Sequence, residues 1–289
     1  MIIATIDIGG TGIKFASLTP DGKILDKAST PTPETLEDLS AWLDQRLSER
    51  DYRGIAMSVP GAVKQETGVI EGISAIPYIH GFSWYEALAH HKLPVHLEND
   101  ANCVGLSELL AHPEIENAAC VVIGTGIGGA MIINGKLHRG RHGLGGEFGY
   151  MTTIEPAEKL NNWSLLASTG NMVRYVIEKS GQSDWDGRKV YQEAAAGNAL
   201  CQEAIERMNR NLAQGLLNIQ YLIDPDVISL GGSISQNPDF IKGVQKAVDA
   251  FVDRYEEYTI APVIQACTYQ ADANLYGALV NWLQEENQW

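Results

Sequence analysis

Residues 7–14 read Asp-Ile-Gly-Gly-Thr-Gly-Ile-Lys and directly follow a short apolar run over residues 2–8. An alternating apolar pattern resumes at residues 13–18, so residues 9–12 are predicted to form a glycine-rich hairpin turn between two strands. A third strand is expected over residues 24–29, after a Pro-Asp-Gly turn. The chain is therefore expected to open as an antiparallel meander.

The residue types of this turn are those of a phosphate-binding loop. Gly9 and Gly10 allow positive φ and a close approach of N–H groups to an anion, and Thr11 adds a hydroxyl donor. Lys14 is a candidate cation, and Asp7 is a candidate to hold Mg²⁺ through water. The alternative is an ordinary glycine turn after a strand-end aspartate. The spacing matches neither a Walker A loop nor a dinucleotide fingerprint, because no helix follows.

The same pattern recurs in the second half of the chain. A strand is expected over residues 118–123, followed by Gly-Thr-Gly-Ile-Gly-Gly at 124–129 and a second strand that ends at the Asn134-Gly135 hairpin signal. Gly124, Thr125 and Gly126 are the candidates for phosphate binding. Two strand–turn–strand loops, one in each of two related lobes, suit a triphosphate held from both sides.

A third glycine pair, Gly231-Gly232, ends a strand expected over residues 227–230. Strand ends are frequent ligand positions in open α/β sheets, although a plain strand-to-helix turn is the alternative. Further strands are expected at residues 54–59, 95–97 and 263–266, and helices at residues 36–47, 84–91, 101–111, 163–180, 189–196, 199–222, 240–255 and 271–284. We expect an α/β lobe over 1–113, completed by a C-terminal helix at about 271–289, and a second lobe over 114–270.

Composition excludes several classes of protein. The 289 residues carry 21 Lys and Arg against 36 Asp and Glu, for a formal charge of −15, which opposes non-specific binding to nucleic acid. No run approaches the ~20 apolar residues of a membrane span, and the N-terminus does not resemble a signal peptide. The four cysteines form no C-x-x-C pair and are expected to be buried thiols of a cytoplasmic protein.

Two short segments carry candidate acids. Glu-Asn-Asp-Ala-Asn at 98–102 lies between a short strand and a helix. Asn99 or Asp100 is suited to cap that helix, or Asp100 to accept a proton from an attacking hydroxyl in kinase-type phosphoryl transfer. Gly-Gly-Glu-Phe-Gly-Tyr at 145–150 presents Glu147 between glycines, where it is a candidate to bind sugar hydroxyls or a solvated loop acid. No role is assigned to Arg139, Arg141 or His142.

Taken in order, these motifs resemble those of ROK-family sugar kinases, in the actin/hexokinase-like ATPase superfamily. Residues 7–14 resemble the first phosphate motif, 123–131 the second, 230–235 the adenosine motif and 272–279 the second connecting helix. The resemblance covers essentially the whole chain. It implies a two-lobed, actin-like (ribonuclease H-like) α/β ATPase fold with the active site in the interlobe cleft.

The resemblance also implies roles for individual residues. Asp100 corresponds to the general base for the sugar 6-hydroxyl, and Asn99 and Glu147 to residues that bind sugar hydroxyls, with the Gly61 backbone nearby. ATP and Mg²⁺ are the implied cofactors, with Asp7 organising the metal. The implied phosphate contacts are Gly9, Gly10, Thr11, Thr125 and Gly126, and Gly231 and Gly232 are expected under the adenosine. A homodimer is the family expectation.

The sequence departs from the usual family pattern beside Glu147. Most such kinases have a histidine where this chain has Tyr150, followed by a cysteine-rich zinc motif, but residues 151–168 contain no cysteine. Zinc needs about four nitrogen or sulfur ligands and this stretch offers none, so no zinc site and no structural zinc are expected. A second family glutamate falls near Ser164. In the family, the histidine and this glutamate hold the hydroxyls around the anomeric end of a free hexose. Their loss is expected to open that side of the pocket and to shift the selectivity for the sugar.

The variant Gly-Glu-Phe-Gly-Tyr-Met without zinc resembles β-glucoside kinases, which phosphorylate the 6-hydroxyl of the non-reducing glucose in disaccharides such as cellobiose. Tyr150 is a candidate to stack on a sugar ring, or a partly buried structural tyrosine. The alternatives are a kinase of free glucose, fructose or N-acetylmannosamine and a non-catalytic sugar-binding protein. A sugar-responsive repressor of the same family is disfavoured, because the first phosphate strand begins at residue 2 and leaves no room for a helix-turn-helix.

Overall fold

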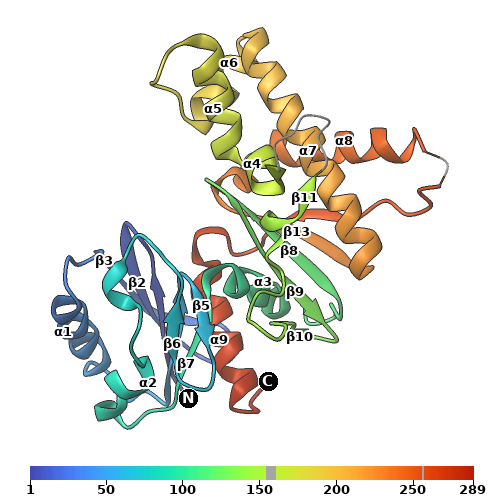
Figure 1. Cartoon of the computed structure of the whole chain (residues 1–289). Coiled ribbons are helices and arrows are strands. Elements are labelled where there is room, and N and C mark those ends of the chain that lie inside the picture. Colours follow the sequence, from blue (N-terminus) through green and yellow to red (C-terminus); the bar gives the residue numbers. More distant parts are fainter. Residues whose placement is uncertain (154–160, 256) are drawn as a thin grey trace. The chain divides into compact units, whose positions relative to one another are not determined.

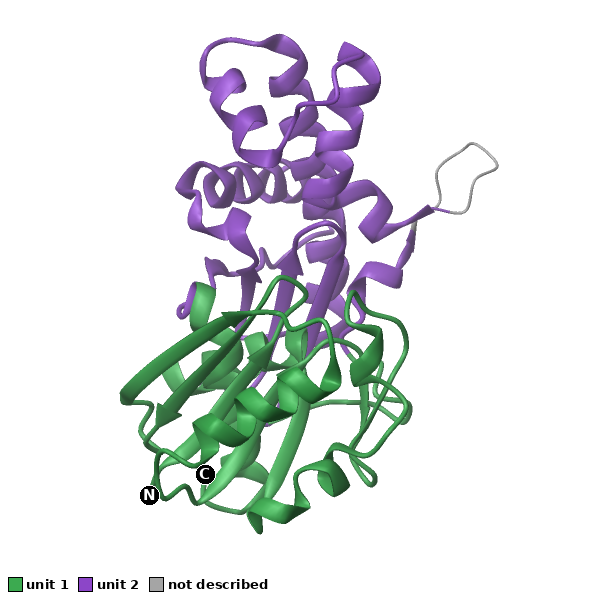
Figure 2. Cartoon of the chain, turned by 90° about the vertical axis from the view of Figure 1, so that its left-hand side faces the viewer, with its two compact units in different colours: residues 1–114, 136–145, 271–289 green, residues 115–135, 146–270 purple. Residues whose placement is uncertain are grey.

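The computed structural model describes residues 1–153, 161–255 and 257–289. The chain divides into two compact units, shown in green and purple in Figure 2: unit 1 comprises residues 1–114, 136–145 and 271–289, and unit 2 comprises residues 115–135 and 146–270. These units differ from the expected lobes in one segment, 136–145, which belongs to unit 1 and not to the 114–270 lobe. The physical reason is a buried ion pair of Arg139, described below.

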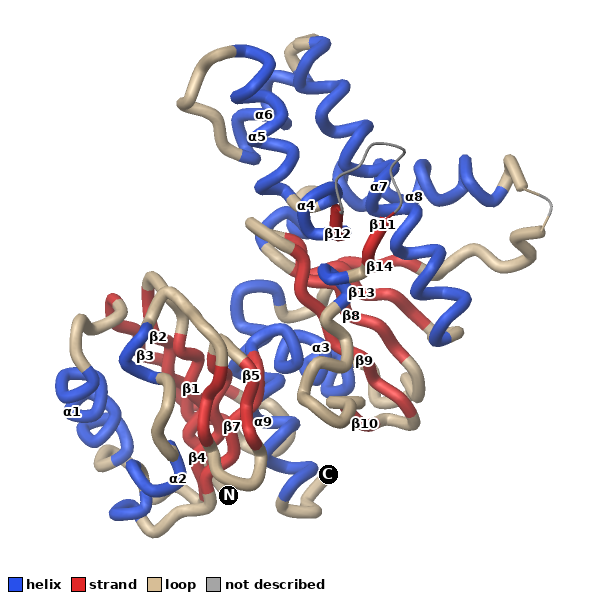
Figure 3. The backbone as a smooth tube through the Cα atoms, in the orientation of Figure 1, coloured by secondary structure: helices blue, strands red, loops and turns tan. Residues whose placement is uncertain are grey.

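Unit 1, which contains the blue N-terminal part of the chain in Figure 1, is built on a five-stranded mixed sheet in the order β3-β2-β1-β4-β7, whose strands are all labelled in Figure 3. Its strands are β1 Ile3–Ile8, β2 Gly12–Leu18, β3 Ile24–Pro31, β4 Gly54–Val59 and β7 Val95–Asn99. β1 pairs antiparallel with β2 and parallel with β4. The glycine-rich hairpin predicted at residues 9–12 is therefore confirmed.

Four helices and a small β-ribbon complete unit 1. They are α1 Leu36–Leu47, α2 Trp84–Ala87, α3 Asp100–Ala111 and α9 Ala273–Glu285, with 3₁₀ turns η1 Pro77–Ile79 and η2 Ala89–His91, the ribbon β5 Ala62–Lys64 and β6 Val69–Glu71, and the two-residue β10 Lys136–Leu137. The helix expected over 84–91 is instead two pieces, because Leu88 leaves the helical region at φ −98° and ψ 3°. The ribbon was not expected from the sequence.

The last helix, α9, is part of the core around the first strands. Its Leu279 and Trp282 are 0% and 2% exposed, and they belong to the same buried cluster as Ile3 and Leu18. The apolar face of α9 therefore shields strands from the other end of the chain. η5 (Gln270–Asp272) leads into this helix.

Unit 2 repeats the strand pattern of unit 1. β8 Ala118–Ile123 pairs antiparallel with β9 Ile127–Ile133 and parallel with β13 Val227–Gly231, which pairs in parallel with β14 Ile264–Ala266. The order β9-β8-β13-β14 thus reproduces β2-β1-β4-β7 (strands red in Figure 3). The internal echo predicted from the two glycine loops is confirmed at the level of strand pairing.

Unit 2 contains more helix than unit 1. Its helices are α4 Trp163–Ala167, α5 Thr169–Ser180, α6 Gly187–Ala195, α7 Ala199–Ile223 and α8 Pro238–Val252, with η3 Phe148–Tyr150, η4 Ser233–Gln236 and the ribbon β11 Thr152–Thr153 and β12 Asn161–Asn162. The helix expected over 163–180 is divided at Ser168. That residue is extended (ψ 157°), and its side chain caps the second helix by accepting a bond from the Asn171 N–H.

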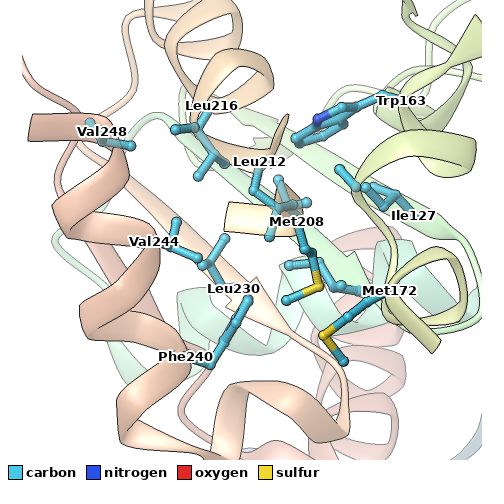
Figure 4. Close-up of a cluster of buried hydrophobic side chains, with 14 of the residues drawn as sticks. Ile127, Trp163, Met172, Met208, Leu212, Leu216, Leu230, Phe240, Val244 and Val248 are labelled. Atoms are coloured by element: carbon cyan, nitrogen blue, oxygen red, sulfur yellow. The ribbon is translucent and has the colours of Figure 1, made fainter. Parts of the chain in front are cut away.

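The core of unit 2 lies where α7 and α8 pack with the sheet (Figure 4). Leu212 and Val244 are both fully buried, and so is Leu230 of β13. Trp163 is 1% exposed, and its indole lies where a side chain at Gly215 would be, since an added Cβ would come within 2.1 Å of the ring. Glycine in the middle of a helix costs about 1 kcal/mol relative to alanine. At Gly215 it makes room for the tryptophan.

Among the described residues, no helix combines the length and apolar character that crossing a membrane requires. All four cysteines are buried and unbridged, as predicted. Two of them, Cys120 and Cys267, place their sulfur atoms 3.6 Å apart as thiols.

Candidate functional site

Asp7 and Lys14 face each other across the first hairpin, because β1 and β2 pair these two residues in register. The Lys14 ammonium lies 3.2 Å from Asp7 Oδ2 and donates to the Ala271 carbonyl at 2.6 Å. The turn is closed by the Gly9 N–H, which donates to the Gly12 carbonyl at 3.1 Å. A cavity of about 420 Å³ opens over Asp7, Gly9, Thr11 and Lys14, while Gly10 and Thr11 are exposed. Unit 1 thus gathers the predicted residues of the first phosphate loop around one hollow.

The Asp7 carboxylate is 6% exposed and held by several donors. Besides Lys14, the Asn274 amide donates to Oδ1 at 2.8 Å and the Ser58 hydroxyl does so at 3.3 Å. A carboxylate has about four lone-pair positions, so these three contacts leave about one for a water molecule. Mg²⁺ prefers oxygen ligands and keeps several of its waters. The geometry of Asp7 therefore fits contact with Mg²⁺ through water better than direct coordination.

Asn99 and Asp100 stand where β7 ends and α3 begins. Asn99 is the cap of α3, since its Oδ1 accepts bonds from the N–H groups of Ala101 and Asn102 at 2.9 and 3.2 Å. Its amide also donates to the Gly61 carbonyl at 3.1 Å, which brings two predicted sugar-site residues together. Asp100 Oδ1 accepts from the Ala101 N–H at 2.8 Å. The capping alternative is therefore correct for Asn99. The cap also sets the position of Asp100, the first residue of α3.

The environment of Asp100 favours its protonated form. Burial raises the pKa of its carboxyl above the ordinary value of 3.8, and the charge of Asp7 raises that pKa further, against hydrogen bonds that lower it. A carboxylate with a raised pKa binds a proton more strongly than an ordinary aspartate. Such a group, at the point where β7 passes into α3 and within range of the Asp7 charge, has the properties that a general base needs.

A buried ion pair supports the backbone just before Asp100. Glu98 is 2% exposed, and its Oε1 accepts from the Asn99 N–H at 2.7 Å and from the Asn102 amide at 2.8 Å. Arg139 donates from Nε to Glu98 Oε2 at 2.6 Å. Its Nη2 reaches two residues of α9, Asn281 Oδ1 at 2.7 Å and Glu285 Oε1 at 3.0 Å. Arg139, which sequence reasoning left without a role, thus ties segment 136–145 and α9 to the Glu98–Asp100 turn.

The second glycine loop belongs to unit 2 and is closed by a bond from the Gly124 N–H to the Gly126 carbonyl at 2.9 Å. The first turn of α5 lies against it, because a Cβ at Gly170 would come within 2.5 Å of the Thr125 carbonyl oxygen. Ser164 Oγ accepts from the Ile127 N–H at 2.7 Å. Where the family resemblance suggested a second sugar-binding glutamate, this chain has a serine that anchors the loop instead.

Gly231 and Gly232 end β13 beside the same loop. Gly232 has φ +89°, and a Cβ there would lie 2.1 Å from the Ile123 carbonyl oxygen, so only glycine fits. Immediately after it, a cavity of about 610 Å³ is lined by Ser233 and Ile234 together with residues of α5, α6 and the turn before α8. Sequence reasoning identified the glycine pair but not the opposite wall: Thr169, Asp186, Arg188 and Tyr191.

Two hydroxyls of this cavity lack a partner within the described part of the chain. Thr169 Oγ1 and the Tyr191 hydroxyl oxygen are buried atoms without a hydrogen bond there. Burial raises the pKa of Tyr191, and the charge of Asp239 adds to that shift, so the hydroxyl keeps its proton. A buried hydroxyl without a partner costs about 1–3 kcal/mol. The two side chains line the cavity, so a small reorientation of each would give its hydroxyl a partner on a bound ligand.

Glu147 precedes the short turn η3, and Tyr150 is its last residue. Glu147 is half-buried, and its carbonyl accepts from the Tyr150 N–H at 3.1 Å. Tyr150 is 71% exposed, so the alternative of a partly buried structural tyrosine is wrong. Of the cysteine-free stretch 151–168, residues 154–160 lie outside the described residues. The described remainder of that stretch contributes to no cluster of metal-ligating side chains.

The sequence and the fold can now be compared with known proteins. The ROK family model matches residues 3–285. The chain belongs to the ROK family. A ROK-family protein from Streptococcus pneumoniae, crystallised in complex with sucrose, is 88% identical, with a TM-score of 0.98 and full coverage of both chains. The predicted actin-like α/β fold and the family resemblance are thereby confirmed.

Relatives of this ROK protein are named as sugar kinases. A β-glucoside kinase of Listeria monocytogenes is 35% identical over 100% of this chain and 99% of its own length. A glucokinase of Halalkalibacterium halodurans is 29% identical, with 98% and 95% of the two chains covered. The protein is a carbohydrate kinase, as predicted.

Sequence reasoning missed residues that act from a distance along the chain. Asn274 holds Asp7, Arg139 holds Glu98, and Tyr191 and Thr169 line the cavity beside Gly232. Arg139 lies in the glycine-rich segment that precedes Glu147. This position was the only feature of the sequence that could have indicated a role for it. Tyr191 lies on an amphipathic helix. In the sequence, its position in the helical repeat is the same as that of an ordinary core residue.

Proposed function

We propose that this ROK kinase transfers the γ-phosphate of ATP to the 6-hydroxyl of a glucose-type sugar. The observation that carries the proposal is Asp100, a carboxylate with a raised pKa, placed at the start of α3 by the Asn99 cap and near Asp7. In this role Asp100 accepts the proton of the attacking hydroxyl. Kinase chemistry requires this base, positioning and charge stabilisation, and little covalent chemistry from the protein.

The nucleotide is assigned to the glycine loops and to the cavity beside Gly232. Gly231 and Gly232 would underlie the adenosine, and the partnerless hydroxyls of Thr169 and Tyr191 would bond its polar atoms. The turns at Gly9 and Gly124 would shape the two loops, since the N–H groups of these residues close them. The phosphates would be held by the N–H groups of Gly10 and Gly126, the hydroxyls of Thr11 and Thr125, and the Lys14 cation. With a net charge of −15, the chain depends on these local donors and not on its overall field.

Mg²⁺ would be held beside Asp7, and when bound it would neutralise the phosphate charge. The Asp7 carboxylate would accept a hydrogen bond from a water molecule of the hydrated ion. Asn274, Ser58 and Lys14 keep this carboxylate oriented. No zinc is required. Removal of Mg²⁺ is expected to stop phosphate transfer, while a chelator selective for zinc leaves it unchanged.

For the sugar, we propose that Asn99 and Glu147 bind hydroxyl groups. Asn99 Nδ2 keeps one N–H besides the one that it donates to the Gly61 carbonyl. The exposed Tyr150 ring is available for stacking on a second sugar unit. Serine at position 164, engaged with the Ile127 backbone, provides no acid for an anomeric hydroxyl. These features support a β-glucoside such as cellobiose as the substrate.

The sucrose complex of the 88% identical protein bears on this choice. Sucrose is a glucoside whose glucose carries no free anomeric hydroxyl, so a relative that takes it up tolerates a substituted anomeric carbon. The full-length similarity to a β-glucoside kinase points the same way. A glucosyl disaccharide is therefore favoured over a free hexose, and sucrose joins the substrates to be tested.

A coupled assay of ADP release tests the substrate. Cellobiose, gentiobiose, sucrose, glucose, fructose and N-acetylmannosamine are compared at equal concentrations, and kcat/KM is determined for each. The expected result is the highest kcat/KM for a β-linked disaccharide. A higher value for any free hexose would overturn the β-glucoside assignment, and absence of turnover with every sugar would overturn the proposed kinase substrates altogether.

Replacing Tyr191 with phenylalanine tests the nucleotide site. Loss of one hydrogen bond of about 1 kcal/mol is expected to raise the KM for ATP about fivefold and to leave the KM for the sugar unchanged. The matched control is Tyr175→Phe, which removes an exposed hydroxyl that donates to Glu203 outside this cavity. An unchanged KM for ATP, or an equal rise in both KM values, would contradict the assignment.

A further inference from the structure

Three potential metal ligands converge on the surface of unit 1, outside the residues assigned to catalysis. Asp44 comes from α1, and His90 and His91 come from the 3₁₀ turn η2. Asp44 Oδ1 lies 3.0 Å from His90 Nε2 and 2.7 Å from His91 Nε2. All three ligand atoms lie within 4.8 Å of one another, and within the described residues this is the group of His, Cys, Asp and Glu close enough to share an ion.

The convergence of the two histidines is unusual for neighbours in sequence. Successive residues of a helical turn point in different directions. Here the two rings nevertheless lie 4.0 Å apart at an angle of 40°. Lys92 follows in the left-handed region at φ 57°, a conformation that non-glycine residues adopt rarely and that ends the turn directly after His91. The local backbone thus presents both Nε2 atoms to one carboxylate oxygen.

The hydrogen bonding of His90 determines what its Nε2 can do. His90 Nδ1 lies 3.1 Å from the Ala87 carbonyl oxygen, which can only accept, so Nδ1 carries the proton. In the neutral ring, Nε2 is then an unprotonated acceptor that faces the Asp44 carboxylate at 3.0 Å. Two acceptors at this distance repel each other unless a cation lies between them or the ring takes up a second proton. A backbone carbonyl on the far nitrogen is also the usual support of a metal-bound histidine.

We propose that Asp44, His90 and His91 form a site for a first-row transition-metal dication such as Zn²⁺ or Ni²⁺. Imidazole nitrogen with one carboxylate is a ligand set that these ions prefer and that Mg²⁺ does not. Tetrahedral Zn²⁺ with bonds of about 2.0–2.1 Å separates its ligands by about 3.3 Å, so the two carboxylate–imidazole separations need to open by only about half an ångström. Asp44 and His90 are 47% and 57% exposed, which permits that adjustment and leaves water as the fourth ligand.

This site differs in place and ligands from the cysteine-rich zinc motif that residues 151–168 lack. It joins α1 to η2, two segments about 46 residues apart in sequence. A bound ion would therefore cross-link the surface of unit 1 and stabilise its fold without taking part in phosphate transfer. The consequence is a zinc-dependent midpoint of thermal unfolding alongside zinc-independent turnover.

Isothermal titration of the tag-free, metal-free protein with ZnCl₂, in the absence of nucleotide, tests the site. The expected result is one equivalent bound in wild type, and at least tenfold weaker binding in each of His90→Ala, His91→Ala and Asp44→Asn. The matched control is His112→Ala, because His112 lies outside this cluster, beside Glu114. This control is expected to bind zinc as wild type does, and all four variants are expected to keep wild-type turnover with Mg²⁺ and ATP.

A second measurement separates the proposal from the alternative of a protonated His90. Zinc is expected to raise the midpoint of thermal unfolding of wild type and of His112→Ala, but not of His91→Ala. If zinc affinity and this thermal shift were the same in wild type and in the three ligand variants, the proposal would be wrong. It would be equally wrong if wild type bound no zinc. Neither result depends on which sugar is the substrate.

Discussion

Asp100→Asn is expected to lower kcat by about 10²–10⁴ while the affinity for the sugar changes little. Asparagine has the shape of aspartate and can still accept the Ala101 N–H, so the start of α3 is preserved. It cannot take a proton from the attacking hydroxyl. The measurement pairs a coupled assay of ADP release with a calorimetric titration of the sugar, and Asp21→Asn, in an exposed hairpin turn, is the control.

The pH dependence of the wild-type enzyme gives the same residue a second test. Burial, and then the charge of Asp7, raise the pKa of Asp100 above 3.8. A base must be ionised to act, so turnover is lost as the pH falls through this pKa, and the loss begins at a higher pH than for an ordinary aspartate. Turnover of Asp100→Asn within a few-fold of wild type, or an acid limb at the ordinary value, would show that another group is the base.

Arg139→Met is expected to lower the free energy of unfolding by about 3–5 kcal/mol. The change leaves Glu98, whose side chain is 3% exposed, as a buried charge without its cation. Burial opposes the charge of Arg139, but the carboxylates of Glu98 and Glu285 raise its pKa overall, so the guanidinium stays charged. Because Glu98 also holds the Asn99 N–H, kcat is expected to fall as well. Urea denaturation and the coupled assay measure the two effects.

Further variants keep this prediction testable if Arg139→Met folds poorly. Arg141→Met, an exposed arginine two positions away, is the control and is expected to change stability by less than about 0.5 kcal/mol. Glu98→Gln combined with Arg139→Met removes both charges and is expected to recover part of the loss. Arg139→Lys is expected to fall between wild type and Arg139→Met, since lysine lacks the planar fork that reaches Glu98, Asn281 and Glu285. Equal stability of Arg139→Met and Arg141→Met would contradict the role of the pair.

Local patterns predicted much of this fold because they reflect local physics. Apolar runs bounded by glycine turns located β1, β2, β8 and β9, and helical patterns located α3, α7 and α9. The same patterns did not show the helix breaks at Leu88 and Ser168. At each of these positions a single residue leaves the helical region inside a continuous apolar pattern. The ribbon of β5 and β6 is three residues per strand, too short to show a period.

The sequence located those residues of the candidate site whose type is unusual at their position in a strand or helix. Glycine runs after strands and the acid at the start of α3 have recognisable local context. The residues that orient them do not, because their contacts join distant positions: Arg139 and Asn281 are 142 residues apart, and Asp7 and Asn274 are 267 apart. Only the folded chain reveals such partners.

The position of α9 in the chain has a consequence for biosynthesis. This helix covers Ile3, Ala16 and Leu18, yet it follows β1 by more than 260 positions, as the Asp7–Asn274 contact shows. At a translation rate of about 5–20 residues per second, the first strands wait on the order of 10–50 s before their cover has been synthesised. Unit 2, which is encoded between the two, can complete its core earlier. The nascent meander is therefore the stretch of this kinase most in need of a chaperone at the ribosome.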